Sequence, residues 1–245
     1  MKLPALLAFV FLLAGCGHKP VTVTAPPAPP IQQKVPAGTP PAESNKNASE
    51  IPLESVEIAP DAKPLLVETG IASWYGAPYH NRRGSNGEIY DMHAMTAAHR
   101  TLPLGSIVRV TNPENGKSAI VRITDRGPFI EGRILDLSRA AADQIGVVQK
   151  GTAMVRIEVL KTPEPIEAGG KWAVQIGGFG HEENARDLAG HLSRRYHTAR
   201  VLTFSSPAGD WWVRVRVKDD VRARAEEVMH QAKTSEGAVF LVRLD

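Results

Sequence analysis

Hydrophobic and polar residues alternate in short runs between residues 68 and 160, where the runs are rich in β-branched side chains and bounded by Gly, Pro and Asn. A period of two over such short runs is typical of β-strands that bury one face. Asn115-Gly116 indicates a hairpin turn, and residues 137–145, which end before Gly146, predict the one helix. The predicted strands are residues 70–75, 106–110, 118–123 and 153–159. We therefore expect residues 68–160 to form a small, mainly β domain that closes into a barrel.

The pattern of hydrophobic and polar positions changes after residues 161–170, a short linker rich in Pro, Glu and Gly. From there to residue 245, runs of period two alternate with two amphipathic segments of helical period. The predicted strands and helices, in chain order, are residues 172–179, 182–195, 199–204, 211–217, 219–233 and 238–244. This strand-helix-strand-strand-helix-strand (βαββαβ) order predicts a ferredoxin-like α+β domain at residues 171–245, with helices on one face of its sheet and the other face free to bind.

The N-terminal residues predict export rather than a membrane span. Lys2 precedes an apolar run, residues 3–14, that is too short for a spanning helix, which needs about 20 residues. The run ends in Leu13-Ala14-Gly15-Cys16, which resembles the bacterial lipoprotein signal. The resemblance implies cleavage of residues 1–15 and acylation of Cys16, and Gly17 after the cysteine implies the outer membrane. The alternative is an ordinary signal peptide that holds a cysteine by chance.

Residues 16–67 are predicted to be a lipidated N-terminus followed by a disordered tether. Eleven of the 19 prolines fall between residues 20 and 64, with almost no aromatic residues, so this stretch cannot bury a core. As an extended polyproline chain it reaches roughly 150 Å. Such a length would let the folded domains work in the periplasm at a distance from the membrane.

Charge and composition exclude several classes of function. The formal net charge of +3 comes from 29 Lys and Arg against 26 Asp and Glu, without a concentrated basic segment, so we expect no nucleic-acid partner. The single cysteine excludes an intramolecular disulfide and a zinc site with several cysteines. His80, His93 and His99 lack a spaced carboxylate motif, so we predict no metal and no cofactor.

Three side chains of the predicted barrel are candidates for chemistry. Glu88, His99 and Asp125 all lie beside turn residues at the ends of predicted strands, a position that brings side chains to a barrel rim where a groove can form. Each has a plainer interpretation as well. Glu88 and Asp125 also suit turns, and His99 also suits a hydrogen-bonded surface position.

Five motifs of this region together resemble the rare lipoprotein A family. They are Trp74-Tyr75-Gly76, Asp91-Met92, Met95-Thr96-Ala97-Ala98-His99-Arg100-Thr101-Leu102-Pro103, Asp125-Arg126-Gly127-Pro128-Phe129 and Asp136-Leu137-Ser138. The resemblance implies a double-psi β-barrel and a septal-ring lytic transglycosylase. Such an enzyme cleaves glycan strands between N-acetylmuramic acid and N-acetylglucosamine without water and leaves a 1,6-anhydro sugar. The resemblance further implies that Asp125 and His99 take part in catalysis and that Glu88 supports them.

In that chemistry a carboxyl that stays protonated near neutral pH can protonate the leaving oxygen. Asp125 is our choice for this acid, with His99 orienting it or carrying a proton. Arg126 would oppose the role if its side chain points inward, and the sequence leaves its direction open. Asp136, the rival carboxylate, is expected to cap the following helix. The sequence departs from the family at Asn81, where glycine is usual, and at Gly84-Ser85.

The second domain resembles a SPOR domain, a family implied to bind glycan strands stripped of their stem peptides at the division septum. Residues 172–177 with Phe179, Asn184, Ala185 and Leu188 carry the resemblance. Period two predicts a core that includes Trp172 and an open sheet face for sugar rings. The residues predicted on the open face are Gln175, Phe179, Trp212, Arg214 and Arg216. An RNA-recognition sheet is the runner-up, although an exported protein meets no RNA. A face covered by a partner or by the other domain is a third possibility.

Two functions of different classes therefore remain. One is an endolytic peptidoglycan lytic transglycosylase that its second domain localises, and the other is a non-enzymatic wall-binding lipoprotein that organises the septum. Either would be a monomer with peptidoglycan strands and divisome proteins as partners. Its lipid on Cys16 would hold it at the outer membrane, facing the periplasm and enriched at the septum. The presence of Glu88, His99 and Asp125 favours the enzyme.

Overall fold

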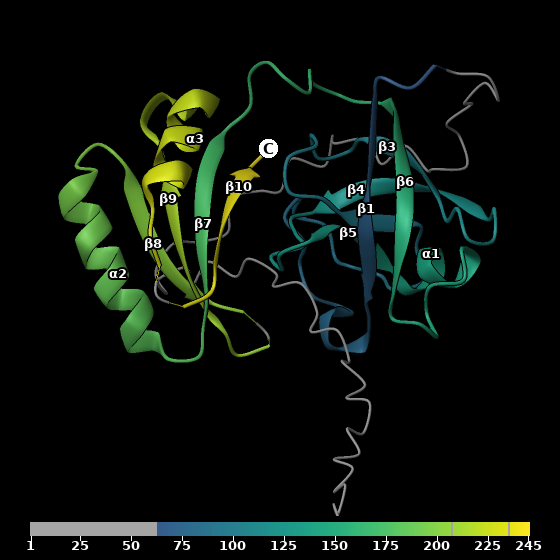
Figure 1. The fold of residues 1–245 in the computed structure, drawn as a ribbon, viewed down its shortest axis with the longest axis horizontal. Coiled ribbons are helices and arrows are strands. Elements are labelled where there is room, and N and C mark those ends of the chain that lie inside the picture. The colour runs from purple at the N-terminus through teal and green to yellow at the C-terminus, as the bar shows by residue number, and fades with distance from the viewer. Residues whose placement is uncertain (1–62, 207, 235) are drawn as a thin grey trace, which may run out of the picture.

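The computed structural model describes residues 63–206, 208–234 and 236–245, which form two domains side by side (Figure 1). The predicted signal peptide, Cys16 and the tether up to residue 62 lie outside the described residues. In the described part of the chain, no helix has the length and apolar character that would let it cross a membrane.

The first domain is a closed six-stranded barrel whose strands follow the order β1-β5-β2-β4-β3-β6. Two pairs, β1 with β5 and β2 with β4, run parallel, and the other pairs run antiparallel. This architecture confirms the predicted barrel. The strands are β1 (Leu66–Tyr75), β2 (Thr96–Ala98), β3 (Ile107–Thr111), β4 (Ser118–Asp125), β5 (Arg133–Ser138) and β6 (Thr152–Lys161), with a short 3-10 helix η2 (Ala77–Tyr79) after β1.

Alternate residues of these strands fill the barrel interior, as period two predicts. Burying one such aliphatic side chain stabilises the fold by roughly 1.5–3 kcal/mol. The fully buried members include Val108, Val110, Val121, Ile123, Leu135, Leu137, Val155, Ile157 and Val159. The predicted hairpin is also confirmed. β3 and β4 pair antiparallel on either side of Gly116, whose φ of +70° suits a residue without a Cβ.

The predicted helix at residues 137–145 is wrong in its first part. Leu137 and Ser138 end β5, and helix α1 spans only Arg139–Gln144. Because Leu135 and Leu137 are both fully buried two residues apart, they belong to a strand that faces the barrel interior. Ser138, not Asp136, caps the helix, since its Oγ accepts a hydrogen bond of 3.2 Å from the amide of Ala141.

The second domain has the predicted order of elements and the antiparallel sheet order β10-β7-β9-β8. Its two main helices pack on one face of the sheet, around Trp172, Val174 and Ile176. Figure 1 shows α2 on the side of the sheet that lies away from the barrel. The elements are β7 (Trp172–Phe179), α2 (Glu182–Arg195), β8 (Arg200–Ser205), β9 (Trp211–Arg216), the short 3-10 helix η3 (Lys218–Asp220), α3 (Arg222–Gln231) and β10 (Ala238–Arg243).

The other face of this sheet packs against the barrel. Phe129, in the loop after β4, forms an aromatic cluster with Trp212 and Phe240, at centroid distances of 5.6 and 5.8 Å. The amide of Arg243 donates to the carbonyl oxygen of Arg100 at 3.0 Å, which joins the two backbones. The prediction that this face is open is therefore wrong for this structure, in which the barrel covers the face, as the alternative interpretation expected.

The strand assignment of Leu137 has a measurable consequence for stability. We expect Leu137→Ala to lower the free energy of unfolding by about 2–5 kcal/mol, because it leaves a cavity inside the barrel. Met154→Ala, at a side chain that is 45% exposed on β6, is the matched control and should change it by less than about 0.5 kcal/mol. Urea unfolding of both variants checks this, and equal effects would contradict the placement of Leu137.

Candidate functional site

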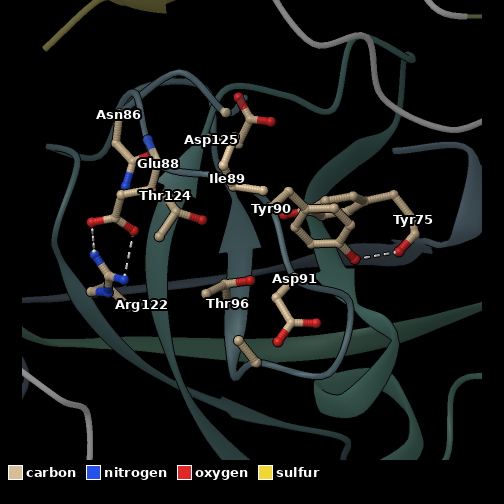
Figure 2. Close-up of a pocket in the computed structure, with 12 residues that line it drawn as sticks. Tyr75, Asn86, Glu88, Ile89, Tyr90, Asp91, Thr96, Arg122, Thr124 and Asp125 are labelled. Atoms are coloured by element: carbon tan, nitrogen blue, oxygen red, sulfur yellow. Dashed lines mark hydrogen bonds and ion pairs between the residues drawn. The ribbon is translucent and has the colours of Figure 1, made fainter. Parts of the chain in front are cut away.

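A small cavity at the barrel rim brings two of the three predicted catalytic residues together. Asp125, at the end of β4, and Glu88, in the loop before β2, both line it, with Tyr75, Tyr90 and Thr96 among the other walls (Figure 2). Its volume is about 60 Å³. Typical ligand sites measure about 300–1,000 Å³, so this cavity as it stands is too small for a sugar ring.

Asp125 is buried at the end of its strand and surrounded by hydrogen-bond donors. Its Oδ1 accepts from the backbone amides of Ser85 at 3.0 Å and Arg126 at 2.7 Å, and from the Ser85 hydroxyl. Burial raises the pKa of the Asp125 carboxyl, and the bonds from Ser85 and the Arg126 amide oppose that rise without cancelling it. The carboxyl therefore keeps its proton to a higher pH than a free aspartate does.

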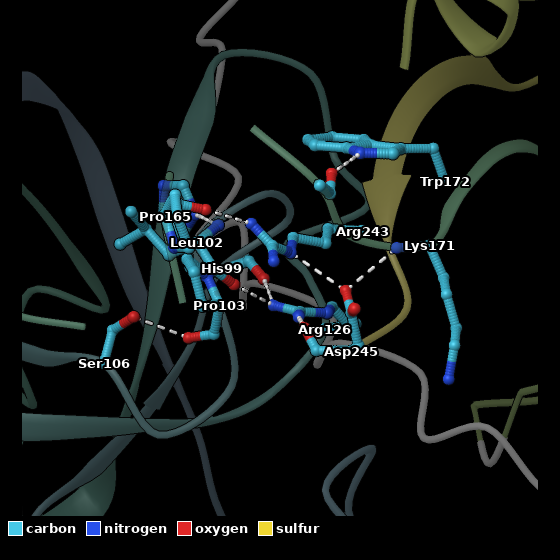
Figure 3. A network of polar contacts seen from close by, with 11 residues as sticks. His99, Leu102, Pro103, Ser106, Arg126, Pro165, Lys171, Trp172, Arg243 and Asp245 are labelled. Atoms are coloured by element: carbon cyan, nitrogen blue, oxygen red, sulfur yellow. Dashed lines mark hydrogen bonds and ion pairs between the residues drawn. The ribbon is translucent and has the colours of Figure 1, made fainter. Parts of the chain in front are cut away.

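The Arg126 side chain points away from the Asp125 carboxylate, which resolves the question the sequence left open. Its Nη1 donates to the carbonyl oxygens of His99 at 3.0 Å and Leu102 at 2.6 Å, and its Nη2 donates to the carbonyl oxygen of Asp245 (Figure 3). Of the named influences on the pKa of Asp125, the Arg126 charge is the weakest. Arg126 thus leaves the acid role open to Asp125.

Glu88 has the opposite electrostatic environment. Its two carboxylate oxygens accept from Nη1 and Nη2 of Arg122, each at 2.8 Å, in a two-pronged pair. This hydrogen bonding lowers the pKa of Glu88. The cavity therefore combines a carboxyl whose pKa is raised with a carboxyl whose pKa is lowered, and such a pair suits acid catalysis beside a cationic transition state.

His99 is a neighbour of Asp125 through the backbone, but its ring lines a different cleft. Its amide donates to the carbonyl oxygen of Asp125 at 3.1 Å. The ring Nδ1 accepts from the amides of Thr101 and Leu102, at 3.2 and 3.0 Å, which leaves the hydrogen on Nε2. Nε2 faces Oε2 of Glu68 at 3.4 Å. Burial lowers the pKa of His99, and the contact with Glu68 opposes this.

The cleft beside His99 has a volume of about 280 Å³ and lies between the two domains. Glu68, His99, Arg100 and Thr101 form its barrel side. Its other side comes from the second domain, and the residues there are Met229, Val239, Phe240 and Leu241. The structure therefore gathers Asp125 and Glu88 in one cavity and sets the His99 ring in an adjoining interdomain cleft.

Sequence reasoning missed three residues that shape these sites. Ser85 holds the Asp125 carboxyl, Glu68 faces His99, and Ser73 binds Asp136, whose carboxyl also lies 3.9 Å from Arg133. Only Ser85 carried a signal, because it falls where the sequence departs from the family pattern. Glu68 and Ser73 are ordinary residues of a strand, and only the closure of the barrel brings them to their partners.

Two further positions of the first domain have clear explanations. Asn81, which stands where the family usually has glycine, adopts a φ of +65°, a conformation that asparagine tolerates better than most residues. His80 and His93 lie edge to face at 5.9 Å. The described residues contain no group of three or more His, Cys, Asp or Glu side chains with the geometry to hold a metal ion.

The predicted sugar-binding residues of the second domain occupy different environments. Gln175, Trp212 and Arg214 are buried on the face against the barrel, where Nη2 of Arg214 donates to Oε1 of Gln175 at 2.6 Å. Arg216, nearer the edge, makes a two-pronged pair with Asp220 at 2.9 Å. Phe179 lies in the core under the helices, so its predicted place beside Gln175 is wrong.

A bulge in β7 explains the misplacement of Phe179. The pairing with β9 shifts register between Gly177 and Phe179, and this breaks the period of two. Gly177 has a φ of +146°, and a Cβ there would lie 2.6 Å from the carbonyl oxygen of Trp211. Only glycine fits so close an approach, and the shift turns Phe179 toward the core.

Comparison with known proteins agrees with both folds. Residues 67–157 match the family described as lytic transglycolase, and residues 168–243 match the SPOR domain. The chain is therefore a double-psi β-barrel of the lytic transglycolase type joined to a SPOR domain. The two matches and the relatives below make the chain similar to proteins of the rare lipoprotein A family.

Relatives from several bacteria carry the name endolytic peptidoglycan transglycosylase RlpA. The one from Vibrio cholerae is 52% identical over 136 residues, which cover 53% of this chain and 52% of the relative. The one from Neisseria meningitidis serogroup B is 50% identical over 133 residues, 54% of this chain and 56% of the relative. The match thus spans about half the length of each of these two relatives. Among solved structures, a Streptomyces papain inhibitor aligns over 41% of this chain and 100% of its own, at 21% identity, with a TM-score of 0.33.

The Ser85 hydroxyl should control the protonation of Asp125. We expect Ser85→Ala to raise the pKa of the Asp125 carboxyl further, because the variant removes a hydrogen bond to its charged form. Carbon-13 NMR titration of the aspartate carboxyls measures this directly. Ser118→Ala, at an exposed serine that begins β4, is the control and should leave the titration unchanged. A pKa that stays the same or falls in Ser85→Ala would contradict the role of Ser85.

Asp136 should make the stability of the fold depend on pH. Burial raises its pKa from 3.8 to about 6, so the folded state binds a proton more tightly than the unfolded state does. Its stabilising contribution is complete below pH 3.8 and is lost as the pH rises through about 6. The free energy of unfolding of Asp136→Asn, relative to that of wild type, should therefore be higher at pH 7 than at pH 4 by about 2 kcal/mol. Urea unfolding at both pH values checks this, and a constant difference would contradict it.

Proposed function

We propose that this protein is an endolytic lytic transglycosylase, which cleaves peptidoglycan strands between N-acetylmuramic acid and N-acetylglucosamine and leaves 1,6-anhydro ends. The observation that carries the proposal is the pairing at the barrel rim. A buried Asp125, whose pKa is raised by burial, shares one cavity with Glu88, whose pKa is lowered by Arg122. The family and the names of the relatives support the same activity.

In the proposed reaction, the protonated Asp125 gives its proton to the glycosidic oxygen as the bond to the anomeric carbon of the muramic acid breaks. The charged Glu88 carboxylate stabilises the positive charge that develops on the sugar ring. The Asp125 carboxylate then accepts the proton of the 6-hydroxyl of the same sugar as that oxygen attacks the anomeric carbon. One carboxyl serves both steps, so no second carboxylate is needed to activate water.

The donors around Asp125 suit this alternation between acid and base. The amides of Ser85 and Arg126 and the Ser85 hydroxyl all point at Oδ1, so they stabilise the carboxylate that forms once the proton has left. Burial, in turn, favours return of the proton. His99 is proposed to position the Asp125 strand end through its amide, while its ring lines the separate cleft between the domains.

The second domain is proposed to bind glycan strands that lack stem peptides, through Gln175, Trp212 and Arg214, with Arg216 at the edge of the same sheet. In this scheme Phe179 supports the sheet from its core. The signal at Cys16 supports a lipid anchor in the outer membrane on the periplasmic side. Septal enrichment, divisome partners and a monomeric state complete the proposal.

A second candidate, a wall-binding lipoprotein without enzymatic activity, is favoured by one observation. The cavity beside Asp125 holds only about 60 Å³, and the His99 ring faces a separate cleft. A catalytic groove must be wider than this to admit a glycan strand. The enzyme therefore has to open before it acts, whereas a binding protein would have no such need.

The products released from amidase-treated sacculi distinguish the two functions. With the full chain purified in detergent, mass spectrometry should detect fragments with 1,6-anhydro ends. Asp125→Asn should reduce their release by roughly 10²–10⁴-fold, because the acid step is lost. His99→Ala should reduce it as well, because it removes the ring that accepts from the amides of Thr101 and Leu102 and so holds the backbone that donates to Asp125. Met154→Ala, at an exposed side chain of β6 that lines neither the cavity nor the cleft, is the control and should retain full activity.

Other products would change the assignment. Reducing ends in place of anhydro ends would mean hydrolysis and a second catalytic carboxylate. No release by a chain that still binds the sacculi would contradict the enzyme and favour the wall-binding lipoprotein.

A further inference from the structure

The sheet face that is proposed to bind glycan is occupied by the barrel. Phe129 of the barrel packs on Trp212 and Phe240, and the Arg100 guanidinium lies 5.4 Å from the centroid of the Phe240 ring. Gln175, Trp212 and Arg214 are at most 6% exposed as a result. A sugar strand cannot reach these side chains while the two domains are in contact.

The covered face still contains polar groups that the barrel does not satisfy. Nε2 of Gln175, Nε1 of Trp212 and Nε of Arg214 are buried and have no hydrogen-bond partner among the described residues. Buried donors without partners cost free energy, so this contact is weaker than its aromatic packing suggests. Hydroxyl, acetamido and carboxylate oxygens are the acceptors that these donors lack, and a glycan strand without stem peptides carries all three kinds.

The same contact also closes the catalytic side. The second domain supplies Met229, Val239, Phe240 and Leu241 as one wall of the cleft that His99 lines. Phe129 follows Asp125 by four residues in the same loop, so the aromatic cluster fixes the loop that begins at the proposed acid. Docking of the sheet thus restricts access to the proposed glycan-binding face and also restricts the loop that begins at Asp125.

The linker between the domains allows them to separate. β6 ends at Lys161 and β7 begins at Trp172, so ten residues join them and reach about 30 Å when extended. The linker contacts both domains. Ile166 packs against the barrel core, whereas Nη1 of Arg243 donates to the carbonyl oxygen of Pro165 at 2.7 Å and Arg222 pairs with Glu167 at 2.7 Å. Separation of the domains therefore requires the linker to give up either the contact of Ile166 with the barrel or its bonds to Arg222 and Arg243.

We propose that this docked arrangement is an autoinhibited state, in which the barrel and a glycan strand without stem peptides compete for one face of the second domain's sheet. When the strand takes that face, the domain leaves the barrel, the His99 cleft opens and the Asp125 loop is released. Cleavage is thereby limited to strands that the second domain has already captured. This inference rests on the proposed function and adds its regulation.

A substitution in the barrel can weaken docking without altering the proposed glycan-binding face. Phe129→Ala removes the aromatic contact and leaves every residue of the second domain unchanged. If docking competes with glycan, the full chain carrying this variant should bind amidase-prepared strands roughly tenfold more tightly, because more of the chain is in the open state. Phe129→Leu, which keeps an apolar contact, is the matched control and should lie close to wild type.

Hydrogen exchange on the unaltered full chain tests the same idea without relying on a variant. Saturating amidase-prepared strands should speed exchange in residues 99–104 and 126–130 of the barrel, whereas strands that keep their stem peptides should not. Slower or unchanged exchange there at saturation, or equal affinities of wild type and Phe129→Ala, would overturn the autoinhibited state and leave the proposed function standing. No binding by either chain would overturn both the competition and the proposed glycan reader.

Discussion

The arrangement of the site depends on one buried side chain, Arg126, whose guanidinium joins three segments of the chain. It donates to the carbonyl oxygens of His99 and Leu102 after β2 and to that of Asp245 after β10, while its own backbone lies in the loop after β4. Its side chain is inaccessible to solvent, and burial lowers its pKa to about 9. A charge removed from water persists only where carbonyl dipoles replace its hydration, so Arg126 holds these three segments together as long as the second domain stays docked.

That constraint fixes the electrostatics around the proposed acid. Because the Arg126 guanidinium is engaged with carbonyl groups, Asp125 meets mainly neutral donors, and its burial decides the direction of its pKa. Glu88, which lines the same cavity, has a direct cationic partner in Arg122 that lowers its pKa. The neighbours of the two carboxyl groups on this rim thus shift their pKa values in opposite directions, which is the arrangement that acid catalysis by one of them uses.

In the proposed autoinhibited state, the barrel and a glycan strand compete for the same face of the second domain's sheet. Aromatic packing between Phe129, Trp212 and Phe240 favours the docked state, whereas buried donors without partners on Gln175 and Arg214 oppose it. Burial also lowers the pKa of Arg214 to about 10, although the nearby Asp125 charge raises it. Docking therefore places Arg214 of the proposed glycan-binding face within electrostatic range of Asp125. A ligand that binds the separated state modestly better than the docked state is enough to shift the equilibrium between the two states.

Local pattern determined much of this protein. Period two and turn residues predicted four barrel strands and the hairpin at Gly116, and the alternation of periods predicted every main element of the second domain close to its observed bounds. The motifs around His99 and Asp125 indicated the family. These features are local because hydrogen bonding and amphipathic burial act over a few residues.

Tertiary structure decided the rest. β2 and the start of β5 acquire strand character only by pairing inside a closed barrel, Phe179 changes face because Gly177 meets the backbone of Trp211, and Glu68 reaches His99 across 31 positions of the sequence. The direction of Arg126 and the covered sheet face depend on contacts between segments more than 100 residues apart, such as Arg126 with Asp245, at a separation of 119. A pattern read along one segment carries no information about which distant backbone will approach it, so only the folded chain could settle these points.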